Sequence, residues 1–287
     1  MANYQIFTDS GSDLPESVRD TLNIKMVSLS LLFRGAVIPD SVSGEIKEMY
    51  DALRSGEVAK TAAVNPETWA AAIEPCLAAG EDALVLAFSS GLSATCQSAV
   101  IAAGELMEKY PGRTVRVVDT LCASLGEGLF VWHVCKKRDE GLSLEELADW
   151  AEENKLKLCH WFTVDDLMYL KRGGRVSAAT ALVGSLLKIK PVLHVDDEGH
   201  LINVSKVRGR KASIEALAAE MEKTALPGKN DTAFICHGDC LEDAEYLASL
   251  IKERCGVKEV LIGYTGAVIG SHAGPGVLAL FFLGEHR

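Results

Sequence analysis

The sequence predicts an α/β protein of two domains, and three features of the chain lead to this fold class. Strand-like and helical segments alternate through the first half, where strands such as residues 82–88 are continuous apolar runs. Such runs between helices are typical of a parallel sheet covered on both faces. In the second half, residues 189–195 and 200–206 predict a hairpin and hence a mixed sheet. We therefore predict an N-terminal three-layer α/β/α domain over residues 1–157 and a C-terminal α/β domain with a mixed sheet over residues 158–287.

Local signals define the elements of the first half. Asp13–Glu16 and Asn65–Glu67 each combine a capping residue with an acid in the first turn, which favours a helix start. Ser143–Glu146 form a capping box for a helix that ends near Lys157. Apolar runs and periodicity predict strands at 4–8, 25–33, 82–88 and 114–118, and helices at 43–54, 93–109 and 122–138.

The second half is less regular. It ends in a glycine-rich stretch from Gly266 to Gly276 and an apolar run to Leu283. The patterns before it predict strands at 159–164, 189–195, 200–206, 231–236 and 258–264, and helices at 165–171, 177–187, 210–225 and 241–254.

Composition excludes several classes of function. A net charge of −11 disfavours nucleic acid as a partner and non-specific docking on an anionic membrane, although a transient membrane contact stays open. No signal peptide opens the chain and no apolar run is long enough to span a bilayer. We therefore expect a cytoplasmic protein whose cysteines are reduced.

No metal or nucleotide cofactor is expected. Cys236 and Cys240 lie four residues apart, but no second pair of ligands accompanies them, and structural zinc sites usually need four. The chain also has no Walker motif and no dinucleotide fingerprint, so we do not expect it to bind ATP itself.

Residues 88–95, FSSGLSAT, place four hydroxyl groups at the end of the predicted strand 82–88, where open parallel sheets bind ligands. One interpretation is that Ser90 or Ser93 caps the following helix. A second is a nucleophile elbow, since the turn is one residue from the G-x-S-x-G pattern and would pair Ser93 with a later base such as His272. A third is a cradle for a carboxylate or phosphate, with Thr61 as a second hydroxyl before a helix.

Three basic groups are further candidates. Arg175 follows two glycines, a pattern that either ends a helix beside a solvated arginine or places the arginine at an anionic head group. Residues 206–211, which include Arg208, are the strongest basic run of an acidic chain and either are solvated or face a partner protein. His272 lies among glycines that permit close backbone approach to a ligand.

Motifs over nearly the whole chain, from residue 8 to residue 276, resemble those of the DegV family. Each is weak alone, but all occur in the family's order. They are Thr8-Asp9-Ser10 with Asp13-Leu14-Pro15, Lys60-Thr61 leading to Pro66-Glu67, Ser89 to Thr95, Val118-Asp119-Thr120, Leu167-x-x-Leu170 with Gly173-Gly174-Arg175, Ile189-Lys190-Pro191, Lys206-Val207-Arg208, and Ile269-Gly270-x-His272-x-Gly274-Pro275-Gly276.

The resemblance implies a non-catalytic protein that binds one long-chain fatty acid between two α/β domains. Some family members are the acyl-carrying subunit of a bacterial fatty acid kinase, whose ATP-binding partner phosphorylates the bound carboxylate for phospholipid synthesis. By the family pattern, Thr61 and Ser93 bind the carboxylate and Arg208 faces the kinase. The ligand-binding residues expected from the resemblance and the turn are Thr61, Ser90, Leu92, Ser93, Arg175 and His272.

The sequence also departs from the family pattern. Ala62, Ala63 and Val64 replace the polar part of a T-S-Q-P stretch, Ala94 replaces glycine and Thr120 replaces serine, which leaves the finer head-group contacts and the acyl preference open. Two alternatives to a kinase subunit remain, namely a stand-alone lipid carrier or sensor and a serine hydrolase that uses Ser93. Leu92, Cys96, Ile101 and Met107 could line a tail pocket or fill the core, and we expect them to fill the core.

Overall fold

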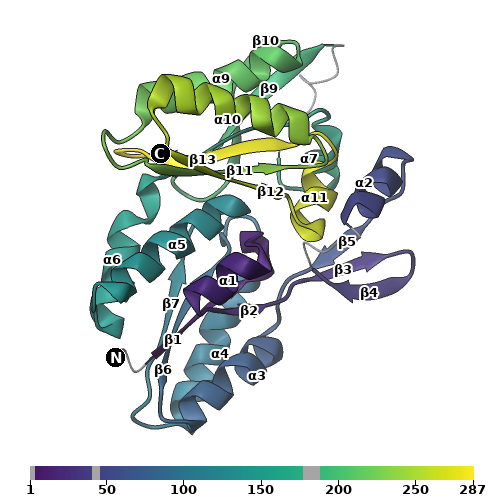
Figure 1. The fold of residues 1–287 in the computed structure, drawn as a ribbon. Helices are drawn as coiled ribbons and strands as arrows, with labels where there is room; N and C mark the ends of the chain where they lie inside the picture. The colour runs from purple at the N-terminus through teal and green to yellow at the C-terminus, as the bar shows by residue number, and fades with distance from the viewer. Residues whose placement is uncertain (1–3, 41–45, 177–187) are drawn as a thin grey trace.

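The computed structural model describes residues 4–40, 46–176 and 188–287, and its two halves are built around separate sheets (Figure 1). The sheet of the first half has the order β2-β1-β6-β7 with all strands parallel, as predicted. Its strands are β1 (Tyr4–Asp9), β2 (Lys25–Val27), β6 (Asp82–Ala87) and β7 (Val115–Asp119). The helix predicted at 177–187 lies outside the described residues.

Helices cover both faces of this sheet, because alternate residues of a strand point to opposite sides. Phe7 and Val85 pack with α3 (Pro66–Ala78) and α4 (Thr95–Lys109). Ile6 and Leu84 pack with the helices of the other face. These helices are α1 (Glu16–Leu22), which follows the 3-10 turn η1 (Ser10–Ser12), α5 (Leu125–Asp139) and α6 (Leu144–Asn154). The three-layer arrangement predicted for the first half is therefore confirmed.

A small antiparallel sheet that the sequence analysis missed extends from the first half beside α2 (Ile46–Arg54) (Figure 1). Its order is β4-β3-β5, with β3 (Ser30–Phe33), β4 (Ala36–Pro39) and β5 (Lys60–Ala62). Thr61 therefore lies in a strand, paired with Leu31, and the prediction that it ends a loop was wrong. Strands of three or four residues are too short to produce a clear alternation of apolar and polar residues.

The second half contains the predicted mixed sheet, with the order β10-β9-β8-β13-β11-β12. Strands β11 and β12 are parallel, and the other neighbours are antiparallel. The strands are β8 (Leu158–Thr163), β9 (Ile189–Val195), β10 (Leu201–Arg208), β11 (Thr232–His237), β12 (Glu259–Tyr264) and β13 (Leu278–Leu283). The domain border predicted at residue 157 stays a prediction; it coincides with the end of the 3-10 turn η2 (Lys155–Lys157), between the two sheets.

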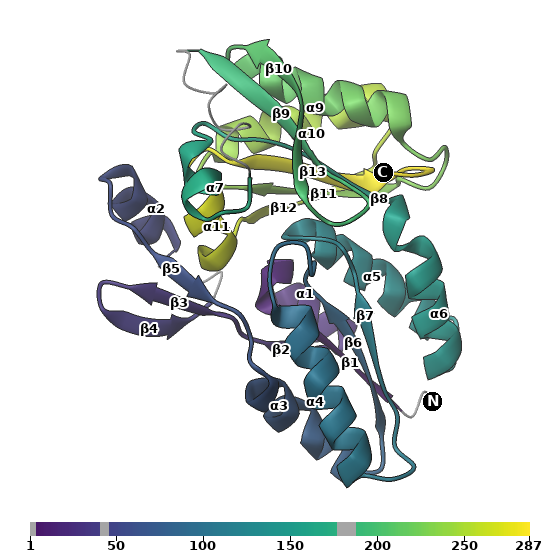
Figure 2. The same ribbon diagram turned by 180° about the vertical axis from the view of Figure 1, so that it is seen from behind.

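The two faces of the second sheet have different neighbours. Helices α9 (Arg210–Thr224) and α10 (Leu241–Cys255) cover one face through a core of their own. The other face rests on α5 of the first half, because Phe162, Phe234 and Phe281 share a core with Leu125 and Leu129. Figure 2 shows α5 beneath this sheet from the opposite side. The two halves therefore bury apolar surface against each other.

Two of the three predicted helix starts are confirmed by their caps. The Asn65 side chain accepts the Thr68 N–H at 2.8 Å, and Ser143 with Glu146 forms a complete capping box. Asp13 does not cap α1, because its carboxylate accepts the hydroxyl of Ser124 instead. Its sequence context fits a cap, but a distant partner has recruited the side chain.

Helix α11 (Ala267–Ala273) belongs to the second half by sequence and packs into the first. Its Ala267 and Val268 are part of the core that contains Tyr50 and Trp69. The Tyr50 hydroxyl, on α2, donates to the carbonyl of Thr265 at 2.8 Å, directly before the helix. This insertion fixes the position of one half relative to the other.

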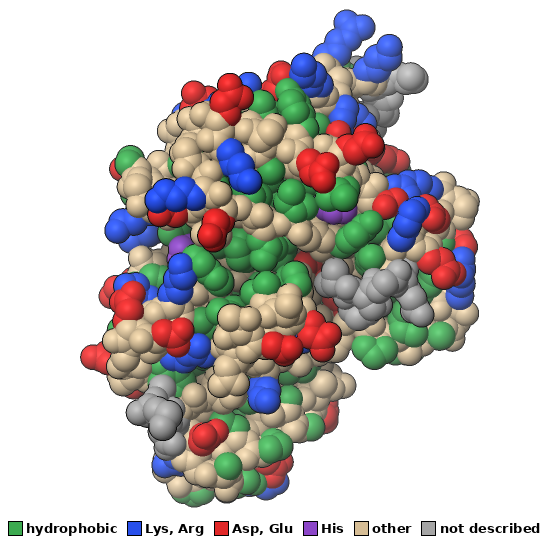
Figure 3. All heavy atoms as spheres, in the orientation of Figure 1, with side chains coloured by type: hydrophobic (Ala, Val, Ile, Leu, Met, Phe, Trp, Pro, Cys, Tyr) green, Lys and Arg blue, Asp and Glu red, His purple; other side chains and the backbone are tan. Residues whose placement is uncertain are grey.

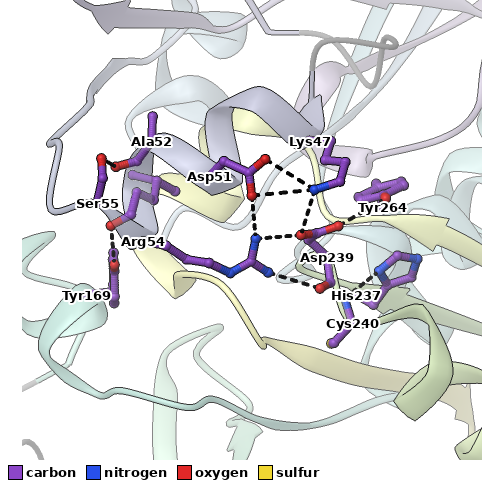
Figure 4. Close-up of polar contacts among 11 residues, drawn as sticks. Lys47, Asp51, Ala52, Arg54, Ser55, Tyr169, His237, Asp239, Cys240 and Tyr264 are labelled. Carbon is purple, nitrogen blue, oxygen red and sulfur yellow. Dashed lines mark hydrogen bonds and ion pairs between the residues drawn. The ribbon is translucent and has the colours of Figure 1, made fainter.

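Polar contacts hold α2 to the second half on the outer side of α11 (Figure 4). Arg54 Nη1 lies 2.5 Å from Oδ2 of Asp239, which follows β11. The Tyr169 hydroxyl, on α7 (Met168–Arg172), donates to the carbonyl of Leu53 at 2.9 Å. Arg54 is partly exposed, so its ion pair contributes at most about 1 kcal/mol, and the buried contacts of α11 dominate.

Two buried carboxylates of the first half hold the beginning of α11. Asp40 Oδ1 accepts the Val268 N–H at 3.0 Å, and Oδ2 accepts the Ser10 hydroxyl at 2.8 Å. Burial raises the pKa of Asp40 to about 6, although these hydrogen bonds oppose the shift. Burial, together with the nearby charge of Asp40, raises the pKa of Asp13 well above its usual range, and the N–H of Gly266 partly offsets the rise.

Gly126 on α5 marks a close approach of the two halves, and it generates a stability prediction. A Cβ atom there would lie 2.3 Å from Nε2 of His160 and 2.7 Å from Cδ1 of Phe281. We expect Gly126→Ala to lower the free energy of unfolding by about 3 kcal/mol, because both buried rings would have to shift to admit the methyl group. Gly104, inside α4, has open space around it, so Gly104→Ala is expected to raise the same quantity by about 1 kcal/mol. Urea unfolding of the two variants measures both effects, and equal shifts would contradict the packing shown here.

The raised pKa of Asp40 predicts how stability changes with pH. The unfolded chain releases this proton near pH 3.8, and the folded protein keeps it to about pH 6. The group therefore lowers stability progressively from about pH 4 to pH 6 and by a constant amount above that. Asp40→Asn removes the titration and keeps an acceptor for the Val268 N–H. The free energy of unfolding of this variant relative to the native protein should rise by about 3 kcal/mol between pH 4 and pH 7.

Asp51→Asn is the matched control, because hydrogen bonding to Lys47 lowers the pKa of the exposed Asp51. For Asp51→Asn, the free energy of unfolding relative to the native protein should fall as the pH rises, because the native carboxylate stabilises the fold only when it is ionised. Urea unfolding at unit steps of pH measures both series. A difference for Asp40→Asn that does not change with pH would contradict the proton assignment.

Candidate functional site

A cavity of about 300 Å³ lies between the two halves. This volume is at the lower end of the range for small-molecule sites. Figure 3 shows hydrophobic side chains along the seam between the halves. The cavity walls are mostly apolar and come from both halves. The apolar lining residues are Leu29, Ala63, Phe88, Leu92, Ala94, Ala123, Phe162, Leu170, Val195, Leu201, Cys236, Val268, Ile269, Ala273, Val277, Ala279 and Phe281.

The polar residues of the lining fall into two groups. Thr61, Ser93, Arg175 and His272 are half-buried, so this side of the cavity is its mouth. Ser124, His160 and Thr265 are buried in the interior. Four of the six predicted ligand-binding side chains thus meet at the mouth, and Leu92, a fifth, also lines the cavity.

Thr61 and His272 are paired across the mouth. Thr61 Oγ1 lies 2.8 Å from Nε2 of His272, which joins β5 of the first half to the last turn of α11. Burial, followed by the charge of Arg175, lowers the pKa of His272 to about 4, so the ring is neutral at pH 7. A Cβ on Gly173 would lie 2.3 Å from Nδ1 of this ring, so glycine is required for their close approach.

Ser93 lies two residues before Thr95, the first residue of α4. Its Oγ is 2.9 Å from the hydroxyl of Thr95 and accepts the Thr95 N–H at 3.3 Å. The N-cap of α4 is Ala94, so the interpretation that Ser90 or Ser93 caps this helix was wrong, although Ser93 binds the N–H of its first residue. The described partner of its hydroxyl is Thr95, and His272 is bonded to Thr61 instead, so the arrangement does not activate Ser93 as a nucleophile.

Arg175 is a half-buried cation that hydrogen bonds only backbone carbonyls in the part of the chain that the structure describes. Its Nε donates to Leu92 at 3.2 Å and its Nη1 to Gly173 at 2.5 Å. Burial lowers the pKa of this guanidinium, because the charged form loses water. A guanidinium has five N–H donors, so several remain for an anion at the mouth.

Ser90 and Arg208 lie apart from the cavity. Ser90 is exposed, and its N–H donates to Asp119 at 3.2 Å. Arg208 is exposed at the end of β10. Arg210, in the same basic run, forms an ion pair with Asp243, so its charge is already paired. The expectation that Ser90 binds ligand gains no geometric support, and the expectation that Arg208 faces a partner stays a prediction.

Ser89, the first serine of the same turn, connects the two halves. Its hydroxyl donates to the carbonyl of Gly199 at 2.9 Å and accepts the Gly91 N–H at 3.2 Å. Gly199 lies in the turn between β9 and β10, so the buried serine connects the two halves.

Sequence analysis missed most of the apolar lining. Leu29, Phe162, Val195 and Phe281 come from separate strands or loops, and they look like ordinary core residues in the sequence. Cys96 is buried in the core as expected. Leu92 lines the cavity, and Ile101 and Met107 are exposed, so that part of the prediction was wrong.

Metal binding and membrane insertion have no visible basis in the described residues. Cys236 Sγ lies 3.2 Å from the Ser124 hydroxyl, and Cys240 Sγ lies 3.4 Å from the Val277 carbonyl. Across residues 4–40, 46–176 and 188–287, no three His, Cys, Asp or Glu side chains are grouped as metal ligands. Of the helices described there, none has the length and apolar character that crossing a bilayer requires.

Comparison with known sequences places the chain in one family. A family model described as "Uncharacterised protein, DegV family" matches residues 3–285. A DegV domain-containing protein of Clostridium perfringens is 46% identical over 289 residues, which cover 100% of this chain and 99% of the relative. One from Streptococcus pyogenes is 33% identical over 287 residues, which cover 99% of each chain.

Solved structures agree with the fold. A DegV family protein from Thermus thermophilus, described by its fatty acid binding, is 33% identical with a TM-score of 0.87 over 98% of this chain and 99% of that one. A Thermotoga maritima protein, described as revealing a fatty acid binding function, is 30% identical with a TM-score of 0.84 over 99% of this chain and 100% of that one. With a sequence match over nearly its whole length and the same fold, the chain belongs to the DegV family.

Proposed function

We propose that the chain binds one long-chain fatty acid in the cavity and presents its carboxylate at the mouth to a partner fatty acid kinase. One observation carries the proposal: an apolar cavity opens beside a half-buried arginine that has no acidic partner among the described residues. An apolar molecule with an anionic end fits both features. The similar DegV structures that are described as binding fatty acids support this ligand class.

The two ends of a fatty acid make different demands on a site. Each CH₂ group that leaves water contributes about 0.8 kcal/mol, so a long chain supplies enough free energy to exceed the cost of association. The carboxylate must keep its hydrogen bonds, because a buried charge without partners is very costly. In the proposed complex, Thr61, Ser93, His272 and Arg175 provide those bonds.

A neutral His272 suits this role. The ring offers one N–H donor and one acceptor, so the carboxylate replaces the present bond to Thr61 and both groups turn their donors to the ligand. The charge of the ligand is then balanced by Arg175, whose charge already acts on His272.

The kinase partner is the finer part of the proposal. The mouth residues are half-buried, so a carboxylate held there stays within reach of a second protein. The sequence carries no nucleotide-binding motif, which assigns the ATP chemistry to that partner. We place the pair in the cytoplasm, with Arg208 on the surface that faces the kinase and with no nucleic acid involved.

Two other functions use the same cavity. A stand-alone lipid carrier or sensor would bind the fatty acid without a kinase. A serine hydrolase would use Ser93, but its hydroxyl is bonded to Thr95 and has no described base beside it. Covalent labelling of Ser93 by a fluorophosphonate probe would favour the hydrolase over our proposal.

Native mass spectrometry tests the ligand class directly. We expect the purified protein to carry a mass increment of one fatty acid, and the delipidated protein to bind palmitic acid. Thr61→Val and Ser93→Ala should each weaken this binding by about tenfold, because each removes a hydrogen bond to a charged group. Ser90→Ala is the matched control and should bind as the native protein does, since Ser90 is exposed and outside the cavity. A protein that carries no lipid and does not take up palmitic acid would disprove the proposal.

Charge reversal at Arg208 tests the kinase surface. For Arg208→Glu we expect unchanged palmitic acid binding and at least tenfold slower phosphorylation of the bound acid by ATP and the partner kinase, because like charges then oppose docking. Lys25→Glu, on β2 in the other half, is the control and should leave both quantities unchanged (Figure 1). If Arg208→Glu loses palmitic acid binding while the acid that is still bound is phosphorylated at the normal rate, Arg208 does not lie on the kinase-facing surface.

A further inference from the structure

The first turn of α11 is held by acids from the other half. Asp40 Oδ1 accepts the Val268 N–H at 3.0 Å, and the N–H groups of Ala267 and Gly266 also face Asp40 and Asp13. A Cβ on Gly266 would lie 2.4 Å from Oδ1 of Asp13, so the backbone lies directly against this carboxylate. The helix start therefore has fixed partners in the first half.

The other end of the same helix carries His272. Seven residues make about two helical turns, so the two ends lie about 10 Å apart and move as one rigid unit. A displacement of the helix start thus appears at the His272 ring. The bond of that ring to Thr61 depends steeply on distance and angle.

We propose that Asp40 is a positioning residue for the head-group site, which holds the beginning of α11 and thereby sets where His272 meets the ligand. The proposal rests on the fatty-acid function described above. Asp40 is not itself part of the cavity lining, so it acts on the site through the elements that it holds.

Asp40 is itself fixed from a second direction. Its Oδ2 accepts the Ser10 hydroxyl at 2.8 Å, and Ser10 Oγ accepts the Leu29 N–H at 3.0 Å. Leu29 lines the cavity, so the chain from Leu29 through Ser10 to Asp40 joins one wall to the helix that forms another. Ser28 adds a bond from its hydroxyl to the Asp40 carbonyl at 3.2 Å.

The test compares two probes of the same length, palmitic acid and 1-hexadecanol, on delipidated full-length protein by isothermal titration calorimetry. Asp40→Ala removes the acceptor and should weaken palmitic acid binding by about tenfold, with less than a twofold effect on the alcohol, because only the carboxylate needs His272 in place. Asp40→Asn keeps an acceptor for Val268 and should restore palmitic acid binding to within about twofold. Asp119→Ala is the control, because it removes a half-buried acceptor of the Ser90 and Leu121 N–H groups away from α11.

A second measurement does not depend on the ligand. NMR titration of the ring of His272 in the ligand-free protein should show a pKa that rises towards 6.5 in Asp40→Ala and stays low in Asp40→Asn. If Asp40→Ala does not fold, Ser10→Ala is the milder variant, and it should weaken palmitic acid binding more than hexadecanol binding.

Three results would overturn the proposal. The first is that Asp40→Ala weakens the binding of palmitic acid and of 1-hexadecanol equally. The second is that it does not weaken palmitic acid binding at all, and the third is that it leaves the pKa of His272 unchanged. If the native protein binds neither probe, the proposed function fails, and the His272 titration alone decides the role of Asp40.

Discussion

The insertion of α11 into the first half is the constraint on which the site depends. The helix brings His272 to Thr61, so a mouth made of both halves exists only while α11 stays in place. To hold it, the first half buries Asp13 and Asp40 together, although two like charges in an apolar interior oppose each other. The Val268 N–H at the beginning of the helix binds Asp40, and the positive end of the helix dipole favours a negative charge there. A polar contact inside an apolar seam thereby selects one arrangement of the halves.

Most of the fold was predictable because its large elements carry local signals. Continuous apolar strands indicated the parallel sheet, and caps such as Asn65 and Ser143 gave the helix starts. The small sheet was not predictable, since its strands are short and β4 is exposed along its length. The cap predicted at Asp13 was wrong for a related reason. A local pattern identifies an acid before a helix, but it cannot identify Ser124, a partner 111 residues away.

The site was predictable only in its polar half. Thr61, Ser93, Arg175 and His272 could be singled out before their contacts were known, because they lie in hydroxyl-rich or glycine-rich motifs that resemble those of the family. The apolar walls gave no such signal, because a leucine that lines a cavity and a leucine that fills the core follow the same periodicity. Whether space remains between them depends on how the two sheets and α5 meet, which no single segment encodes.

The pairing of Thr61 with His272 decides how a ligand is held in the proposed complex. Because these groups already satisfy each other, a carboxylate exchanges one hydrogen bond for others, and such an exchange contributes only about 1 kcal/mol for each bond. Affinity then comes mainly from the tail, at about 0.8 kcal/mol for each buried CH₂, while the head sets the orientation. A site that depended on the charge of the carboxylate would lose its ligand as soon as that group was modified. In the proposed complex the fatty acid would stay bound through its tail, which would let a partner protein act on the head without releasing the molecule.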